Sequence, residues 1–259
     1  MVKAYLTIDD SPSADFMGKV EFLAAKKIPA IFFCRGDLLE KRSDEVIKAI
    51  QMGFVAGSHS YLHKRHSTLS ITEASAAIRK NDELLDNIYA KAGVQRKWKL
   101  FRFPYLDNGA GSFPCAPENL TAEEKSWLTK IMSDVVGSCV MPTAAQLAQK
   151  SALQEVLEEL GYQGLPDITS SAYQKGFGKF DINITYCTDD WHLLTRHQAT
   201  YHQAADDLIA KVKRELLPAE TSSPQVILAH DYGEKEPDEA FRLLVSFMQE
   251  SGVDFLSLP

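Results

Sequence analysis

Two adjacent carboxylates follow the first apolar stretch of the chain. Residues 2–8 (VKAYLTI) predict a short buried strand, and Asp9 and Asp10 come directly after it, before a Ser-Pro-Ser turn. Neighbouring carboxylates repel each other, and a bound divalent cation removes that conflict. One aspartate can then bind the metal while the other stays free as a base. The alternative is an ordinary turn, because Asp-Asp-Ser-Pro is also common turn chemistry.

Histidines follow another short apolar stretch, residues 54–57. His59 and His63 are four residues apart, so one helical turn would place both imidazoles on one face, a spacing typical of metal ligands. His66 lies on the same face, and spacing alone does not say which pair binds. Two histidines and one aspartate leave positions for water and substrate, as a catalytic zinc site requires. The alternative is a solvated polar turn.

Three further polar groups come at the ends of later apolar stretches. Arg102, in the sequence FRFPY, can hold a carboxylate, and the proline leaves the backbone N–H of Tyr105 free to point into a site. Asp190 can orient a histidine while the indole of Trp191 forms a pocket wall. His230 ends the stretch VILAH and can act as an acid near neutral pH. Each group alone also fits an ordinary role: a surface salt bridge, a turn, or a hydrogen-bonded histidine at a strand end.

Apolar strand-like stretches alternate with amphipathic helical stretches along the chain. This alternation predicts an α/β fold, a (β/α) barrel that is distorted or incomplete, with seven to eight parallel strands. The carboxyl-terminal tips of such strands share one face, so the polar groups above would meet there. We expect strands at residues 2–8, 29–34, 54–57, 100–103, 182–187, 226–229 and 253–258, and helices at 15–27, 36–52, 72–92, 144–160, 204–217 and 237–250.

Length and composition fit one domain over residues 1–259, with 45% hydrophobic and 24% charged residues. Two segments, 106–143 and 163–180, are long for loops and predict lids or binding walls, with a helix at 122–132 inside the first. The net charge is −7 and no run of Lys and Arg occurs, which argues against nucleic acid or an anionic membrane as partner. No stretch approaches about 18 consecutive apolar residues, so no membrane span is expected.

The four cysteines show no C-x-x-C spacing, which argues against a zinc–thiolate site. Cys34 follows an apolar stretch and predicts an inert buried thiol. Cys115 and Cys139 would be able to pair in an oxidising compartment. The first predicted strand begins at once, without the layout of a signal peptide. As written, the chain therefore predicts a cytoplasmic protein, with a periplasmic or secreted protein whose signal has been removed as the alternative.

The five polar groups occur in a fixed order, each at the end of a predicted strand. In this order, Asp-Asp, His-x-x-x-His, Arg-x-Pro-Tyr, Asp-Trp and Leu-x-His-Asp resemble the motifs of the polysaccharide deacetylases, carbohydrate esterase family 4, also called the NodB-homology domain. The likeness runs from residue 5 to about residue 258, and residues 27–33 (KIPAIFF) resemble the family's second strand. Three positions depart from the family pattern without removing a ligand, base or acid: Ser11 and Leu106 stand where glycine is usual, and Cys187 where aspartate is.

The resemblance implies a role for each residue of the motifs. Asp9 would be the general base and Asp10 a metal ligand, and His59 and His63, rather than His66, would complete the ligand set. Arg102 would hold the base carboxylate, and the Tyr105 N–H would contribute to an oxyanion site. His230 would be the general acid, with Asp190 as its partner. Trp191 would line the groove, and Leu228 would form the floor of the acetyl pocket.

The resemblance also implies an activity. The chain would be a metal-dependent hydrolase that removes N-acetyl groups from an N-acetylated amino sugar or polysaccharide and releases acetate. Zinc is the expected metal, with cobalt or nickel as alternatives, and the expected partner is an N-acetylated glycan or oligosaccharide. Two alternatives are the same scaffold acting on acetyl esters such as xylan or on other C–N bonds, and a non-catalytic carbohydrate-binding module. The sequence does not indicate the oligomeric state.

Overall fold

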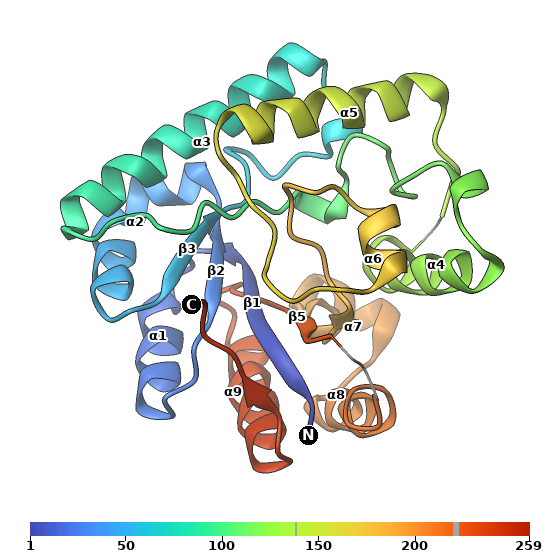
Figure 1. The fold of residues 1–259 in the computed structure, drawn as a ribbon. Helices are drawn as coiled ribbons and strands as arrows, with labels where there is room; N and C mark the ends of the chain where they lie inside the picture. The colour runs from blue at the N-terminus through green and yellow to red at the C-terminus, as the bar shows by residue number, and fades with distance from the viewer. Residues whose placement is uncertain (138, 220–222) are drawn as a thin grey trace.

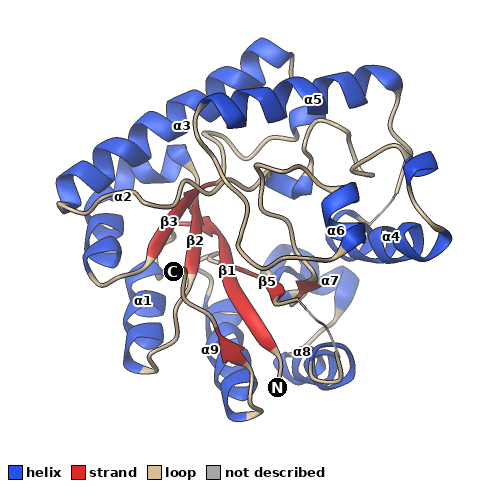
Figure 2. Cartoon of the chain, viewed as in Figure 1, coloured by secondary structure: helices blue, strands red, loops and turns tan. Residues whose placement is uncertain are grey.

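The centre of the molecule is a sheet of parallel strands. The structure is a computed structural model that describes residues 1–137, 139–219 and 223–259. The described strands follow the order β3-β2-β1-β5-β4, and β6 pairs with the start of β1 (Figures 1 and 2). Their bounds are β1 Lys3–Ser11, β2 Ile31–Cys34, β3 Val55–Ser58, β4 Tyr186–Cys187, β5 Gln225–His230 and β6 Asp254–Phe255.

Strand β1 carries the two adjacent aspartates near its carboxyl end, as the apolar stretch predicts. Successive side chains of a strand point to opposite faces. Leu6 and Ile8 belong to the apolar cluster shared with the outer helices, whereas Tyr5 belongs to a cluster on the other face. Asp9 therefore shares the face of Tyr5, and the parallel register of β1 with β5 pairs Asp9 with His230.

β3 and β4 are the two ends of the strand order, and two short stretches, near Phe101 and Ile182, lie between them. Ser58 of β3 forms a parallel bridge with Phe101. The Ile182 N–H donates to the Phe101 carbonyl at 2.6 Å, and the Thr185 N–H donates to the Val226 carbonyl of β5 at 3.0 Å. The strands thus bend round into an incomplete ring, with residues near Phe101 and Ile182 between its two ends.

The expected α/β class with parallel strands is confirmed. The described residues form six strands, where seven to eight are expected from the sequence. The stretch at 100–103 forms only the bridge at Phe101, because a 3₁₀ turn that begins at Pro104 follows directly. The stretches at 182–187 and 253–258 lie where expected but pair over two residues each.

Helices surround the sheet, and most lie where the sequence predicts them. Figure 1 shows α3 and α5 side by side along one edge, with α1 and α9 on the other side of the sheet. Capping explains several boundaries: Ser70 and Glu73 form a capping box before α3, and Gly93 ends it at a φ of 69°. The bounds are α1 Phe16–Ala25, α2 Gly36–Gln51, α3 Ile71–Ala92, α5 Ala144–Glu159, α8 Ala205–Lys211, which continues as a π-helical turn over Val212–Leu216, and α9 Lys235–Glu250.

The two long segments are organised around an apolar cluster of their own. The first contains α4 Ala122–Val136, which extends the helix expected at 122–132, and the second contains α6 Ser171–Gly176, which was not expected. A further short helix, α7 Thr195–Tyr201, was also not expected, because its sequence lacks an apolar period. The buried cluster includes Phe113, Leu128, Met132, Tyr173 and Phe177.

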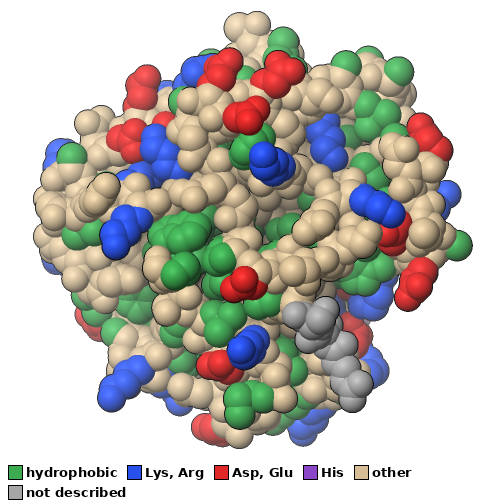
Figure 3. Space-filling view, in the orientation of Figure 1, with side chains coloured by type: hydrophobic (Ala, Val, Ile, Leu, Met, Phe, Trp, Pro, Cys, Tyr) green, Lys and Arg blue, Asp and Glu red, His purple; other side chains and the backbone are tan. Residues whose placement is uncertain are grey.

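The cysteines are unpaired, and charged side chains of both signs lie on the surface. All four cysteines are free thiols in the structure, so the pairing considered for Cys115 and Cys139 is not present. Burial raises the pKa of the Cys34 thiol, as expected for an inert buried cysteine. On the face that Figure 3 shows, acidic and basic side chains are interspersed. Within the described ranges, no helix is long and apolar enough to cross a bilayer.

Candidate active site

Three of the predicted metal ligands lie together at the carboxyl ends of the strands. Asp10, the last residue but one of β1, is in a left-handed conformation with a φ of 62°, and His59 and His63 come from the loop after β3. One ligand atom from each lies within 4.8 Å of the other two. His63 Nε2 is 3.4 Å from Asp10 Oδ1, and the two imidazole centroids are 5.3 Å apart. The structure thus brings together the aspartate and the histidine pair that the family resemblance selects.

These donors fit a divalent cation. Asp10 Oδ1 is buried and accepts no hydrogen bond within the described part of the chain. The Arg102 carbonyl lies 2.9 Å from His59 Nδ1, so Nδ1–H donates to it and the Nε2 lone pair is left for a ligand. Burial lowers the pKa of His59 and of His63, although the charge of Asp10 acts in the opposite direction on both. Both imidazoles are therefore neutral near pH 7, the form that binds metal, and the mixed N and O donor set suits zinc and its neighbours.

One detail of the sequence interpretation is wrong. Residues 59–63 do not form a helical turn. The loop instead reverses at Ser60, which has a φ of 62°, and this turn brings the two imidazoles together. His66 does not join them: its Nε2 lies 3.3 Å from Ser60 Oγ, and its ring packs edge-on against Phe103. Burial lowers the pKa of His66 to about 4, which is expected for a neutral core histidine.

Asp9 lies beside this triad and is held by a buried arginine. Arg102 is completely buried, and its Nη1 donates to Asp9 Oδ1 at 2.8 Å and to Thr7 Oγ1 at 2.8 Å. Its Nε donates to the Ile182 carbonyl at 3.1 Å. The other carboxylate oxygen, Asp9 Oδ2, lies 3.7 Å from His59 Nε2. Arg102 therefore fixes one oxygen of Asp9 and leaves the second facing the space beside the metal triad.

His230 and Asp190 form a second buried pair. The imidazole Nδ1 donates to Asp190 Oδ1 at 2.7 Å, and the His230 backbone N–H donates to Asp190 Oδ2 at 2.7 Å. Burial opposes the charged imidazole, but the charge and hydrogen bond of Asp190, and then Asp10 and Asp9, raise the pKa of His230 to about 9. Burial likewise opposes ionisation of Asp190, yet the charge of His230 holds its pKa below the ordinary value. Tyr232 stacks on the His230 ring at 4.8 Å.

The remaining predicted residues line the same cavity, whose volume is about 700 Å³. Tyr105 has a φ of 58°, a conformation that is costly for a residue with a side chain and that recurs at functional sites. Its N–H donates to no carbonyl or side chain among the described residues. Leu228 of β5 is buried at the cavity wall, and Trp191 packs against Tyr201 of α7 with ring centroids 5.0 Å apart. All three expected pocket residues thus face one space.

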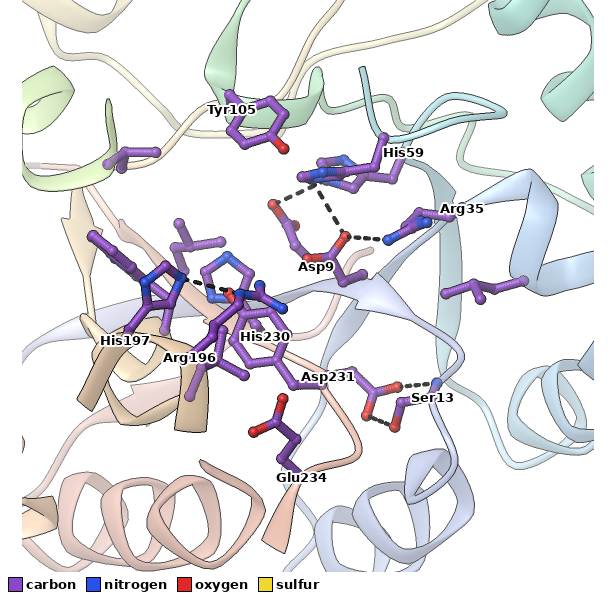
Figure 4. A pocket seen from close by; sticks show the side chains of 18 of the residues that line it. Asp9, Ser13, Arg35, His59, Tyr105, Arg196, His197, His230, Asp231 and Glu234 are labelled. Atoms are coloured by element: carbon purple, nitrogen blue, oxygen red, sulfur yellow. Dashed lines mark hydrogen bonds and ion pairs between the residues drawn. The ribbon is translucent and has the colours of Figure 1, made fainter. Parts of the chain in front are cut away.

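The structure also shows pocket residues that the sequence analysis missed. Figure 4 shows Arg35, Asp9 and His59 on one side of the pocket and Arg196, His197 and Glu234 on the other. Arg35 follows β2, so the rule that polar residues at strand tips converge would have found it. The residues of α7 follow no strand tip directly, and no sequence pattern indicated them.

Asp231, next to His230, anchors the loop after β1. It accepts hydrogen bonds from the Ser13 N–H at 2.8 Å and from Ser13 Oγ, as Figure 4 shows. Its own N–H donates to the Asp9 carbonyl at 2.9 Å. The buried Lys19 of α1 donates to Asp231 at 3.0 Å and also bonds to Asp238 of α9. This network ties β1, β5 and two helices together directly behind Asp9.

Comparison with known sequences agrees with the motifs. The polysaccharide deacetylase family matches residues 2–113. A peptidoglycan-N-acetylglucosamine deacetylase from Bacillus cereus is 31% identical over 101 residues, which cover 39% of this chain and 35% of that protein. The match thus spans about a third of the curated relative's length.

Solved structures with the same fold extend the likeness over the whole chain. A family 4 carbohydrate esterase from Streptomyces lividans in complex with acetate has a TM-score of 0.57 at 17% identity and covers 99% of this chain and 92% of its own. A family 4 pseudoenzyme from Bacillus anthracis has a TM-score of 0.57 at 16% identity, over 98% of this chain and 62% of its own. These matches confirm the resemblance to the polysaccharide deacetylases of carbohydrate esterase family 4, in sequence over residues 2–113 and in fold over nearly the whole chain.

Proposed function

We propose that this chain is a metal-dependent deacetylase that hydrolyses the N-acetyl group of an amino sugar in a glycan. The observation that carries the proposal is the pairing of Asp9 with His230 across β1 and β5, beside the Asp10, His59 and His63 triad. Each member of the pair has its own buried partner, Arg102 for Asp9 and Asp190 for His230. A base and an acid are thus held separately at one site.

Each side chain has one task in this proposal. Asp9 Oδ2 accepts the proton of the attacking water, while Oδ1 stays bonded to Arg102. The Tyr105 N–H donates to the oxygen on which negative charge develops, a contribution worth about 3–4 kcal/mol for a well-placed donor. Asp10, His59 and His63 would hold a divalent cation, with zinc proposed and cobalt or nickel as alternatives, and such a cation would supply Lewis-acid activation of the acetyl carbonyl and of water. Leu228 packs beside the methyl group of the acetamide.

His230 favours an amide over an ester as substrate. An amine leaves readily only when its nitrogen is protonated, whereas an alkoxide from an ester needs less help. Because the pKa of His230 is raised to about 9, its imidazole carries a proton at pH 7. Asp190 holds Nδ1, so the other ring nitrogen, Nε2, is the one that donates to the leaving amine. A general acid of this kind typically contributes about 10²–10⁴-fold in rate.

The acid and base also distinguish an enzyme from a carbohydrate-binding module. Fold alone does not make the distinction, because one structure with this fold is described as a pseudoenzyme. A pure binding protein needs neither a buried arginine that fixes an aspartate nor an aspartate that raises the pKa of a histidine. Both arrangements are present here, at the same end of the sheet.

Acetate release from a panel of N-acetylated glycans, with acetylated xylan as the ester arm, tests the proposal. We expect release from at least one N-acetylated glycan, loss of activity with a chelator and recovery with zinc. Asp9→Asn should abolish turnover without weakening substrate binding. Turnover of xylan acetate alone would replace the amide assignment with an ester assignment. Binding without turnover, equal for wild type and Asp9→Asn, would identify a binding module instead.

A further inference from the structure

The cavity is lined by equal numbers of arginines and carboxylates, although the net charge of the chain is −7. The carboxylates are Asp9, Asp10, Asp231 and Glu234, and the arginines are Arg35, Arg42, Arg65 and Arg196. Two of the arginines are already paired. Arg35 donates to Asp37 through Nε at 3.1 Å and Nη2 at 2.9 Å, and Arg42 donates to Glu45 at 2.7 Å.

The other two arginines have no carboxylate within ion-pair distance in the described part of the chain. Arg196, on α7, is exposed, and its Nε bonds only to the neighbouring His197 at 3.2 Å (Figure 4). Water screens an exposed charge of this kind. Arg65 is half-buried, so its charge is screened less and its position is better defined.

Arg65 is held in place by an aromatic ring. Its guanidinium lies over the Tyr105 ring, 4.4 Å from the centroid, and the same ring lies 4.4 Å from the His63 imidazole. A guanidinium that stacks on a ring keeps its N–H groups free at the edge, in a fork that fits a carboxylate or phosphate. The same aromatic ring therefore contacts both a guanidinium without an acid partner and a member of the metal triad.

A neutral glycan offers Arg65 only hydroxyl and carbonyl oxygens as acceptors. A carboxylate or phosphate can accept two parallel hydrogen bonds from the guanidinium, and such charge-assisted bonds are about twice as strong as bonds to a neutral acceptor. We propose that the substrate of the site is an acidic N-acetylated glycan, and that Arg65 binds a carboxylate or phosphate close to the acetamide. This inference rests on the proposed deacetylase function and names the substrate class within it.

The test compares substrates that differ only in charge. Three N-acetylated oligosaccharides of equal length are used, one neutral, one bearing a carboxylate and one bearing a phosphate, with acetate release as the assay. We expect a higher kcat/KM for one of the acidic substrates, and a KM for it that rises with salt. Which acidic arm is preferred identifies the anion. The same kcat/KM for all three would overturn the inference while leaving the deacetylase proposal intact, whereas no release from any zinc-loaded sample would count against that proposal itself.

Variants assign the effect to Arg65. Arg65→Gln should lower kcat/KM for the preferred acidic substrate by about 10- to 100-fold, mostly through KM, and should lower kcat/KM for the neutral substrate much less. Arg65→Lys keeps the charge and should restore part of the loss. Arg42→Gln is the matched control, because Arg42 lines the same cavity but already bonds to Glu45. Equal losses on neutral and acidic substrates in Arg65→Gln, with an unchanged melting temperature, would contradict the assignment.

Discussion

The Asp190–His230 pair gives the most quantitative prediction. Against the effect of burial, Asp190 and, to a smaller extent, Asp10 and Asp9 raise the pKa of His230 from an ordinary 6.5 to about 9. That difference corresponds to about 3 kcal/mol of interaction with the charged imidazole. Because the pKa in the folded state lies above that in the unfolded state, this stabilisation is fully present below pH 6.5 and is lost as the pH rises through about 9.

Asp190→Asn removes the negative charge of the carboxylate. In the wild type both carboxylate oxygens accept hydrogen bonds from His230, whereas the asparagine amide has one oxygen, so its NH₂ group would face one of the two His230 donors. Burial then dominates, so the pKa of His230 should fall to 6.5 or lower. The free energy of unfolding should drop by about 3 kcal/mol near pH 6, and the gap between variant and wild type should narrow toward pH 9. The alkaline limb of the pH–rate profile should move to lower pH, since the general acid loses its proton earlier.

Two measurements check this prediction. Histidine NMR titration of the metal-free protein reports the pKa of His230, and denaturant unfolding across pH 6–9 reports the stability. Asp189→Asn is the matched control, because the neighbouring Asp189 pairs with Lys211 rather than with His230. If the pKa of His230 in Asp190→Asn equals the wild-type value, or if the stability gap does not depend on pH, the assigned cause of the shift is wrong.

Three further predictions concern the groups around the site. Arg102→Met leaves Asp9 buried without its partner, so the free energy of unfolding, measured in urea, should fall by about 3–5 kcal/mol. Most of the activity should also be lost, and an unchanged urea midpoint would contradict this prediction. Lys19→Met strips Asp231 of its buried cation and should destabilise by a similar amount of about 3–5 kcal/mol. Zinc at 100 times its dissociation constant should stabilise the protein by about 2.7 kcal/mol in thermal unfolding, and His63→Gln should reduce this gain sharply.

The polar residues at the strand tips could be predicted from the sequence, whereas most of the residues that form the walls of the cavity could not. Strand tips in a parallel sheet must converge, so the alternation of apolar stretches was enough to bring Asp9, Asp10 and His230 together. The loop that brings His59 close to His63 depends on the left-handed conformation of Ser60, which the four-residue spacing of the histidines did not predict. The spacing also left His66 as an alternative, and only the family resemblance selected His59 and His63.

The walls depend on contacts between distant segments. α7 is short and lacks an apolar period, so its existence follows from packing rather than from local pattern. Arg65 was part of a polar turn in the sequence, and its position over Tyr105 follows only from the folded chain. The extent of β4 was equally hidden, because a buried apolar stretch does not reveal how many of its residues pair.

The most direct test of the account is a crystal structure of the zinc-loaded protein with anomalous scattering measured at the zinc edge. We expect one strong peak, bonded at about 2.0–2.2 Å to Asp10, His59 and His63, with Asp9 outside the coordination shell and still paired with Arg102. A peak that is absent from this site, or one whose ligands include Asp9 in place of Asp10, would contradict the division of roles between the two aspartates.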